Sequence, residues 1–355
     1  MAPLTAVSRL VGVILPFLLA ATAFAAEPPA AAPAPLGRVT GFPDWVTAVA
    51  FSPDGKMLAA GTYDEVRLIA PDTREVAGTL KTRNGYIRGV AFSPDGSRLA
   101  VGDYQSLSLW EAGAARRVKT FAGHTGYVTA VAFVGDRLLS GSEDGTVRVW
   151  DVASGASERT FEIGVPVNDL AVSPDGSLLA VAAGDATRPN KPGPVTLWDL
   201  KTGEKVADLV GHERAALAVA FGHDGTRLAS AGEDEKVNLH DVPSRKAVGY
   251  YAEHSRSVND VAFLAGDAVL ASVSGGNAGG LCELRLWKPD GTDIAAGEAH
   301  QQRITSLAVS PDGRTLALGS QDKTVSLWDV SLMTGPPAVD GPFRTPAEAP
   351  RPDER

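Results

Sequence analysis

One structural unit recurs along this chain, and each copy ends a strand-like run at an equivalent marker position. Five markers are tryptophans and two are other residues: Ile69, Trp110, Trp150, Trp198, His240, Trp287 and Trp328. Successive markers stand 40 to 48 residues apart, the period expected when the repeating unit is one four-stranded sheet. Seven units predict an all-β protein, a seven-bladed β-propeller of four-stranded antiparallel blades.

The turns inside the repeats favour a simple meander of strands. Four repeats carry Ser-Pro-Asp-Gly after their first strand, starting at Ser52, Ser93, Ser173 and Ser310. Proline presets φ, aspartate bonds to the local backbone and glycine accepts positive φ, so the motif is hairpin chemistry. We expect no function from it.

The ends of the repeat units resemble the WD-repeat family, through Gly123-His124 and Trp150-Asp151 in the third repeat. The resemblance covers roughly residues 36–331 and implies a propeller with a central channel. It also implies a structural hydrogen-bond relay of His124, Ser140, Asp144 and Trp150. Incomplete relays are expected in the fifth repeat (His212, Ser230 and Asp234, with His240 in place of tryptophan) and the seventh (His300, Asp322 and Trp328, with Leu318 at the hydroxyl position).

The last repeat stops after its third strand, at Trp328-Asp329-Val330. An open ring would leave an unpaired strand edge. Because residues 36–40 align with the fourth strands of other repeats, we expect the N-terminal strand to complete the last blade and close the ring.

The sequence predicts four segments: a signal peptide (1–25), a Pro/Ala linker (26–35), the propeller (36–331) and a disordered Pro-rich tail (332–355). Arg9 precedes an apolar run, and Ala23-Phe24-Ala25 fits a cleavage site. Cleavage would place an exported, bacterial-type protein in the periplasm or outside the cell. The alternative, a retained membrane anchor, needs a longer apolar run.

The net charge limits the kinds of partner, and the cysteine count limits disulfide formation. The net charge is −9, and loss of Arg9 makes it more negative, which argues against nucleic acid and anionic lipid as partners. The single cysteine, Cys282, cannot form an internal disulfide.

Motifs for catalysis, cofactors or metals are missing from the sequence. Five of the six histidines fall at repeat positions, which spreads them around a ring, and no zinc set emerges. Nucleophile-elbow, phosphate-loop and haem-attachment motifs are absent. We therefore expect a non-catalytic protein without cofactor or metal, although an enzyme assembled at the channel mouth from scattered residues stays open.

Aromatic residues converge on one sector of one propeller face. Trp45, Tyr86 and Tyr127 precede the first strands of adjacent repeats, and Tyr63 and Tyr104 precede the relay-aspartate position of the first two. With Arg88 nearby, these residues form the predicted binding surface for a protein partner. Two alternatives stay open: the rings only pack against neighbouring loops, or they bind a glycan or small ligand.

Overall fold

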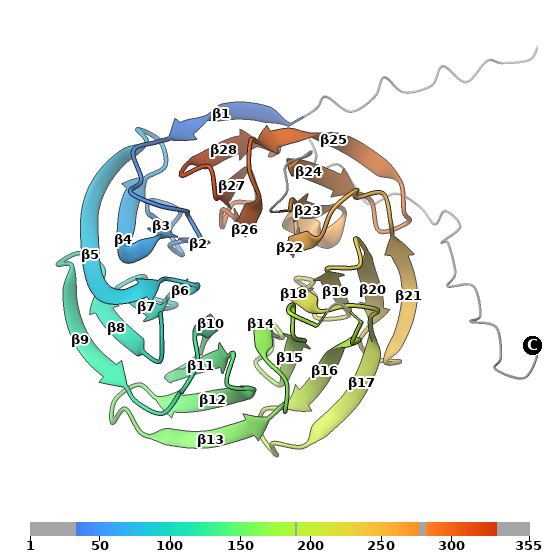
Figure 1. The fold of residues 1–355 in the computed structure, drawn as a ribbon, viewed down its shortest axis with the longest axis horizontal. Coiled ribbons are helices and arrows are strands. Elements are labelled where there is room, and N and C mark those ends of the chain that lie inside the picture. The colour runs from blue at the N-terminus through green and yellow to red at the C-terminus, as the bar shows by residue number, and fades with distance from the viewer. Residues whose placement is uncertain (1–32, 189, 277–281, 332–355) are drawn as a thin grey trace, which may run out of the picture.

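The computed structural model describes residues 33–331, except 189 and 277–281. These residues form seven four-stranded antiparallel sheets arranged in a ring, so the predicted seven-bladed propeller is confirmed (Figure 1). The predicted signal peptide and tail, and nearly all of the linker, lie outside the described residues.

Each blade is a meander that runs from an inner strand at the centre of the ring to an outer strand at its rim (Figure 1). The strands of blades 1 to 4 are as follows: β2 (Ala48–Phe51), β3 (Leu58–Gly61), β4 (Tyr63–Ala70) and β5 (Glu75–Tyr86); β6 (Gly89–Phe92), β7 (Arg98–Gly102), β8 (Leu107–Glu111) and β9 (Arg116–Phe121); β10 (Val128–Val134), β11 (Arg137–Ser142), β12 (Thr146–Asp151) and β13 (Ser157–Glu162); β14 (Val167–Val172), β15 (Leu178–Ala183), β16 (Gly193–Asp199) and β17 (Lys205–His212).

Blades 5 to 7 continue the same order, with one short 3₁₀ turn, η1 (Ala265–Asp267), in blade 6. Their strands are β18 (Ala216–Phe221), β19 (Arg227–Gly232), β20 (Val237–Asp241) and β21 (Lys246–Tyr251); β22 (Val258–Phe263), β23 (Leu270–Ser274), β24 (Cys282–Trp287) and β25 (Asp293–His300); β26 (Ile304–Val309), β27 (Thr315–Ser320), β28 (Val325–Asp329) and β1 (Ala34–Val39).

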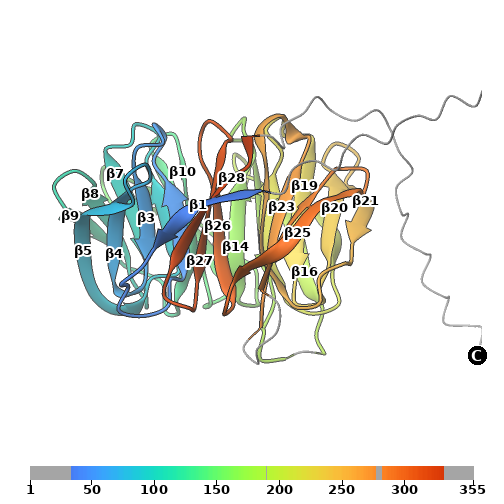
Figure 2. The same ribbon diagram turned by 90° about the horizontal axis from the view of Figure 1, so that it is seen from above.

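The N-terminal strand closes the ring, as predicted. β1 is the outer strand of blade 7 and pairs antiparallel with β28, Val39 lying opposite Val325. Figures 1 and 2 show β1 running beside β28, although the two come from opposite ends of the described chain. The strand begins at Ala34, so its first two residues come from the segment expected to be unpacked linker.

The apolar core lies between blades. Trp150 of blade 3, for example, is buried in a cluster with Leu107 and Phe121 of blade 2. Burying one large apolar side chain contributes about 1.5–3 kcal/mol, so packing between neighbouring blades adds to the stability of each.

A recurring glycine near the end of the second strand permits this close contact. A Cβ on Gly141 would lie 2.6 Å from Cγ1 of Val167 in the next blade, and one on Gly102 would lie 2.7 Å from Cγ1 of Val128. A larger residue at these positions would push neighbouring blades apart.

Candidate interaction face at the channel mouth

Trp45, Tyr86 and Tyr63 form the first of two aromatic groups on the upper face, the face on which the inner strands begin. The Trp45 and Tyr86 rings are stacked, with centroids 5.6 Å apart and planes at 19°. Tyr63 meets Tyr86 edge-on at 5.1 Å. The Tyr86 hydroxyl donates a hydrogen bond of 3.3 Å to Oδ2 of Asp44, which fixes the central ring of the group.

The second group contains Tyr104, Tyr127 and Arg88. The two tyrosine rings meet at 5.0 Å, and their backbones form an isolated antiparallel bridge. The Arg88 guanidinium lies over the Tyr127 ring, 4.2 Å from its centroid, and forms an ion pair with Glu143. The structure therefore brings the six predicted partner-binding residues into two compact groups.

The two groups abut each other. A Cβ on Gly85, the residue before Tyr86, would lie 3.3 Å from the Tyr127 hydroxyl. Trp45, Tyr63 and Tyr104 are 39%, 47% and 48% exposed, whereas Tyr86 and Tyr127 are half-buried. Two supported inner rings thus carry three exposed outer ones: Tyr86 and Tyr127 pack locally, and the other three rings face solvent.

A cavity of about 590 Å³ opens beside the first aromatic group. Its lining includes Trp45, Tyr86, Arg88, Asn259 and Arg303. The loop between β15 and β16 of blade 4 also contributes, through residues 184–187. The cavity therefore joins apolar rings, two guanidinium groups and neutral amides at one end of the propeller.

Arg88 occupies a position that joins neighbouring blades elsewhere in the ring. In other blades, the residue equivalent to Arg88, at the start of the inner strand, donates a side-chain hydrogen bond to a carbonyl oxygen of the next blade. Thr129 donates to Val167 (2.8 Å) and Asn168 donates to Ala216 (2.7 Å). Thr47, Asn259 and Thr305 donate equivalent bonds. Arg88 instead reaches the next blade through the ring of Tyr127 and the carboxylate of Glu143.

Arg303 and Asn259 were missed by the sequence reasoning. Nε and Nη2 of Arg303 donate to Oδ1 of Asn259, at 3.0 and 2.5 Å. Nδ2 of Asn259 donates to the carbonyl oxygens of Gly275 and Ile304, at 3.1 and 2.8 Å. The amide is therefore held with its oxygen toward the guanidinium. The only sequence signal was a charged residue at the position where three blades carry an aromatic.

The predicted relay residues of blade 3 lie together below this face. Nδ1 and Nε2 of His124 lie 2.8 Å from Oδ2 of Asp144 and 2.7 Å from Oγ of Ser140. The Trp150 indole N–H donates to the same Oγ at 2.8 Å. Burial would raise the pKa of Asp144, but hydrogen bonds from Thr146, the Thr125 amide and His124 outweigh it and lower that pKa.

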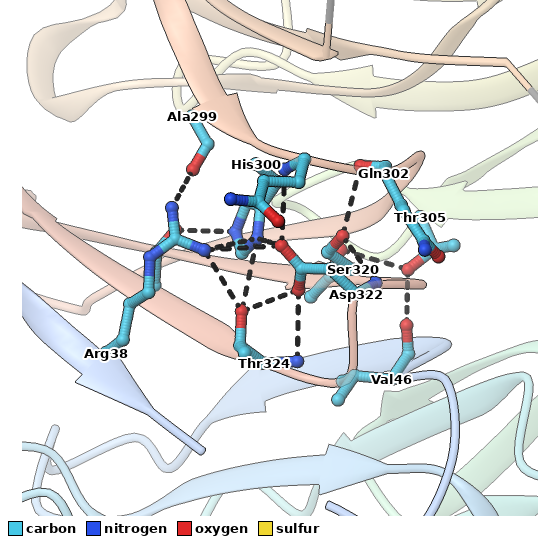
Figure 3. A network of polar contacts seen from close by, with 12 residues as sticks. Arg38, Val46, Ala299, His300, Gln302, Thr305, Ser320, Asp322 and Thr324 are labelled. Atoms are coloured by element: carbon cyan, nitrogen blue, oxygen red, sulfur yellow. Dashed lines mark hydrogen bonds and ion pairs between the residues drawn. The ribbon is translucent and has the colours of Figure 1, made fainter. Parts of the chain in front are cut away.

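The seventh repeat has a complete relay, which corrects the expectation that Leu318 leaves it without a hydroxyl. Ser326, paired with Leu318 on the adjacent strand, lies 2.7 Å from Nε2 of His300 and accepts the Trp328 indole N–H at 2.8 Å. Nδ1 of His300 lies 2.9 Å from Asp322, within the wider network of Figure 3.

Two other tryptophans donate to a hydroxyl at the position equivalent to Ser326. Trp110 donates to Ser108 and Trp198 donates to Thr196, each at 2.9 Å. In each case the acceptor stands two residues before the tryptophan on the third strand of the blade. Comparison of second-strand positions alone could not find it.

The fifth repeat has the incomplete relay that was expected. His212 lies 2.8 Å from Asp234 and 2.9 Å from Ser230. His240 replaces the tryptophan and lies 3.4 Å from Oγ of Ser230. Burial lowers the pKa of His240 to about 4, so this imidazole is neutral at physiological pH.

Within the described part of the chain, no three His, Cys, Asp or Glu side chains are grouped so that they could hold a metal ion. The same residues contain no helix that is long and apolar enough to span a membrane.

Comparison with known proteins identifies the family. The family model for the WD domain, G-beta repeat, matches residues 34–66, 74–111, 115–151, 157–187, 203–241 and 291–329. These stretches make up more than half of the chain, which therefore belongs to the WD40 repeat family. The matched stretches leave out residues 242–290, which hold most of blade 6.

Similar curated proteins are eukaryotic. The chain is 26% identical to the target of rapamycin complex subunit wat1 of Schizosaccharomyces pombe, with 56% of this chain and 75% of that protein covered. It is 30% identical to THO complex subunit 3 of Arabidopsis thaliana (56% and 61% covered). It is 26% identical to Protein FIZZY-RELATED 1 of the same plant (55% and 49% covered). The chain thus spans about half to three quarters of these relatives.

Proposed function

We propose that this protein is a non-catalytic scaffold that binds another protein through the aromatic sector of its upper face. Two relatives are named as subunits of complexes, the target of rapamycin complex and the THO complex. Membership of the WD40 repeat family supports the same general role.

One observation carries the choice of face: three exposed rings, Trp45, Tyr63 and Tyr104, stand in one sector on supported inner rings. Large aromatic side chains held by their neighbours lose little conformational entropy on binding and dominate many interfaces. The ion pair of Arg88 and Glu143 gives this surface a polar border.

The test is a Trp45→Ala, Tyr127→Ala double mutant in affinity capture from an exported fraction. Each hot-spot truncation weakens binding by about 30-fold, the equivalent of 2 kcal/mol, so we expect the captured partner to be lost. A Val118→Ala, Val210→Ala double mutant, which removes exposed apolar side chains from outer strands, is the matched control. Undiminished capture by the aromatic mutant would contradict the proposal.

A glycan is the second candidate ligand, because the stacked and exposed Trp45 borders a cavity lined by amides and charged groups. A sugar ring stacked on Trp45 should quench its fluorescence, whereas a surface that binds only protein should not respond to small oligosaccharides. Trp45→Phe provides the control, since it keeps an aromatic face but removes the indole signal.

We also propose that the mature protein is an exported, bacterial-type family member located in the periplasm or outside the cell. The support is the predicted signal at residues 1–25, which lies outside the described part of the chain. Cell fractionation and N-terminal sequencing test this proposal. A mature chain that begins at Ala26 supports export, and an intact N-terminus on cytoplasmic protein contradicts it.

A further inference from the structure

Arg303 forms no ion pair with any carboxylate of the described residues. Both of its hydrogen bonds go to the neutral amide oxygen of Asn259. Burial lowers the pKa of Arg303, Glu233 opposes this effect, and repulsion from Arg88 adds to it. Arg303 is half-buried, and a partly buried guanidinium is normally paired with an anion, because an unpaired charge away from water is costly.

The carboxylates near the cavity either form ion pairs with other residues or lie beyond ion-pairing distance of Arg303. Glu143 forms an ion pair with Arg88, and Asp185 forms one with Arg188 at 3.1 Å. Glu233 attracts Arg303 but does not lie within ion-pairing distance of it. One oxygen of Glu233, Oε2, is buried without a hydrogen-bond partner, and burial raises the pKa of this carboxyl group.

The cavity that Arg303 lines also has apolar rings in its wall. Trp45 and Tyr86 line the same cavity as Arg303. The guanidinium uses Nε and Nη2 for Asn259, so its Nη1 donors stay available. A planar guanidinium matches a carboxylate better than a lysine does.

We propose that the cavity binds an acidic side chain of a protein partner through Arg303, while an adjacent apolar side chain of the same segment packs against Trp45 and Tyr86. This subsite rests on the proposed function and specifies the chemistry of the partner. The partner segment contains a glutamate or aspartate flanked by apolar residues.

The probe is a pair of peptides, acetyl-Gly-Leu-Glu-Leu-Gly-amide and its glutamine counterpart, titrated into the full propeller. Binding is followed by calorimetry and by the NMR signal of the Arg303 Nε–Hε group. We expect the acidic peptide to bind about 10-fold more tightly than the neutral one, as one charge-assisted pair provides, and to shift this signal.

Three variants decide the result. Arg303→Gln should abolish the preference for the acidic peptide, and Arg303→Lys, which keeps the charge but not the fork, should keep part of it. Glu233→Gln should increase the preference, because it removes a competing negative charge. Arg314→Gln, which changes an exposed arginine in the Ser310 hairpin of the same blade, is the matched control and should change nothing. Thermal unfolding of each variant separates lost binding from lost folding.

Equal binding of the two peptides, no binding of either, or a preserved preference in folded Arg303→Gln would each overturn the inference. The captured partner separates this failure from that of the proposed function. If wild type and Arg303→Gln capture the partner equally but the Trp45, Tyr127 double mutant loses it, only the acidic subsite is refuted. If the double mutant still captures the partner, the proposed aromatic binding surface is refuted as well.

Discussion

Nη1 of Arg38, in the N-terminal strand β1, lies 3.2 Å from Oδ2 of Asp322 in the last blade (Figure 3). The same nitrogen donates to Oγ1 of Thr324 at 3.2 Å, and Nη2 donates to the carbonyl of Ala299. Asp322 in turn belongs to the relay of the seventh repeat. The strand that closes the ring is therefore bound to the blade by side chains as well as by its ladder.

Replacing Arg38 by alanine should destabilise the whole propeller. Arg38 is partly exposed, so solvent screening limits the effect to about 1 kcal/mol in the free energy of unfolding. Urea denaturation measures this change. Arg116→Ala, which breaks the exposed ion pair of Arg116 with Glu111 on an outer strand, is the matched control and should cost clearly less.

Deletion of residues 26–40, which removes β1, should lower the thermal midpoint far more than Arg38→Ala does. An unchanged midpoint would refute closure by β1.

Ser326→Ala should cost as much stability as Ser140→Ala, although only Ser140 occupies the expected relay position. Each substitution removes the shared partner of a buried imidazole nitrogen and of an indole N–H, which is buried in Trp150 and half-buried in Trp328, a loss of about 1–3 kcal/mol. Chemical denaturation compares the two variants with Ser255→Ala, at an exposed serine. A Ser326→Ala protein as stable as the Ser255→Ala control would show that the relocated hydroxyl contributes nothing.

The relay of blade 3 should slow local opening relative to blade 4. Trp150 shares Ser140 with His124 and, through that ring, with Asp144, whereas Trp198 bonds only to Thr196 among the described residues. Hydrogen exchange should therefore be slower for the amides of residues 147–150 than for those of residues 195–198. The reverse order would contradict this prediction.

Two carboxyl groups near the centre of the ring should make the fold less stable as the pH rises. Asp169 accepts hydrogen bonds from the Val219 and Leu170 amides, and Asp260 accepts them from Leu307 and Val261. Burial raises the pKa of Asp169 to about 8, with added repulsion from Asp260, and burial raises the pKa of Asp260 to about 7.

The sign follows from linkage. Between the unfolded pKa near 3.8 and these folded values, the folded state binds more protons than the unfolded state, so stability falls with rising pH. The thermal midpoint should decline from about pH 5 to pH 8 and level off above that range. An Asp169→Asn, Asp260→Asn double mutant should show a shallower decline than an Asp136→Asn control at an exposed site. Equal slopes would refute the assignment.

The repeat pattern was sufficient to predict the blades, their number and the closure, because each depends on the period of the strands and on one missing outer strand. The relocated hydroxyl could not be found in the same way. Leu318 and Ser326 lie opposite each other on antiparallel strands, and opposite residues project to the same side of a sheet. Either residue can supply the hydroxyl, whereas comparing repeats examines one position at a time.

The upper face was predictable only in part. Aromatic residues at equivalent loop positions indicated one sector, and the structure brings them together. Which rings stack and which stay exposed depends on contacts between loops of different blades. The approach of Arg303 to Asn259 also crosses from one blade to another over 44 residues of sequence, and no local motif encodes it.

Closure by β1 also affects how the molecule is made. Arg38 and Asp322 are 284 residues apart in the chain, so nearly the entire propeller must leave the ribosome before they can meet. Until then, β1 has no partner strand, and the first blade lacks the neighbour on one side against which it packs. Assembly of the ring is therefore a late, non-local event in biosynthesis, and a chain truncated before β28 would retain two open edges.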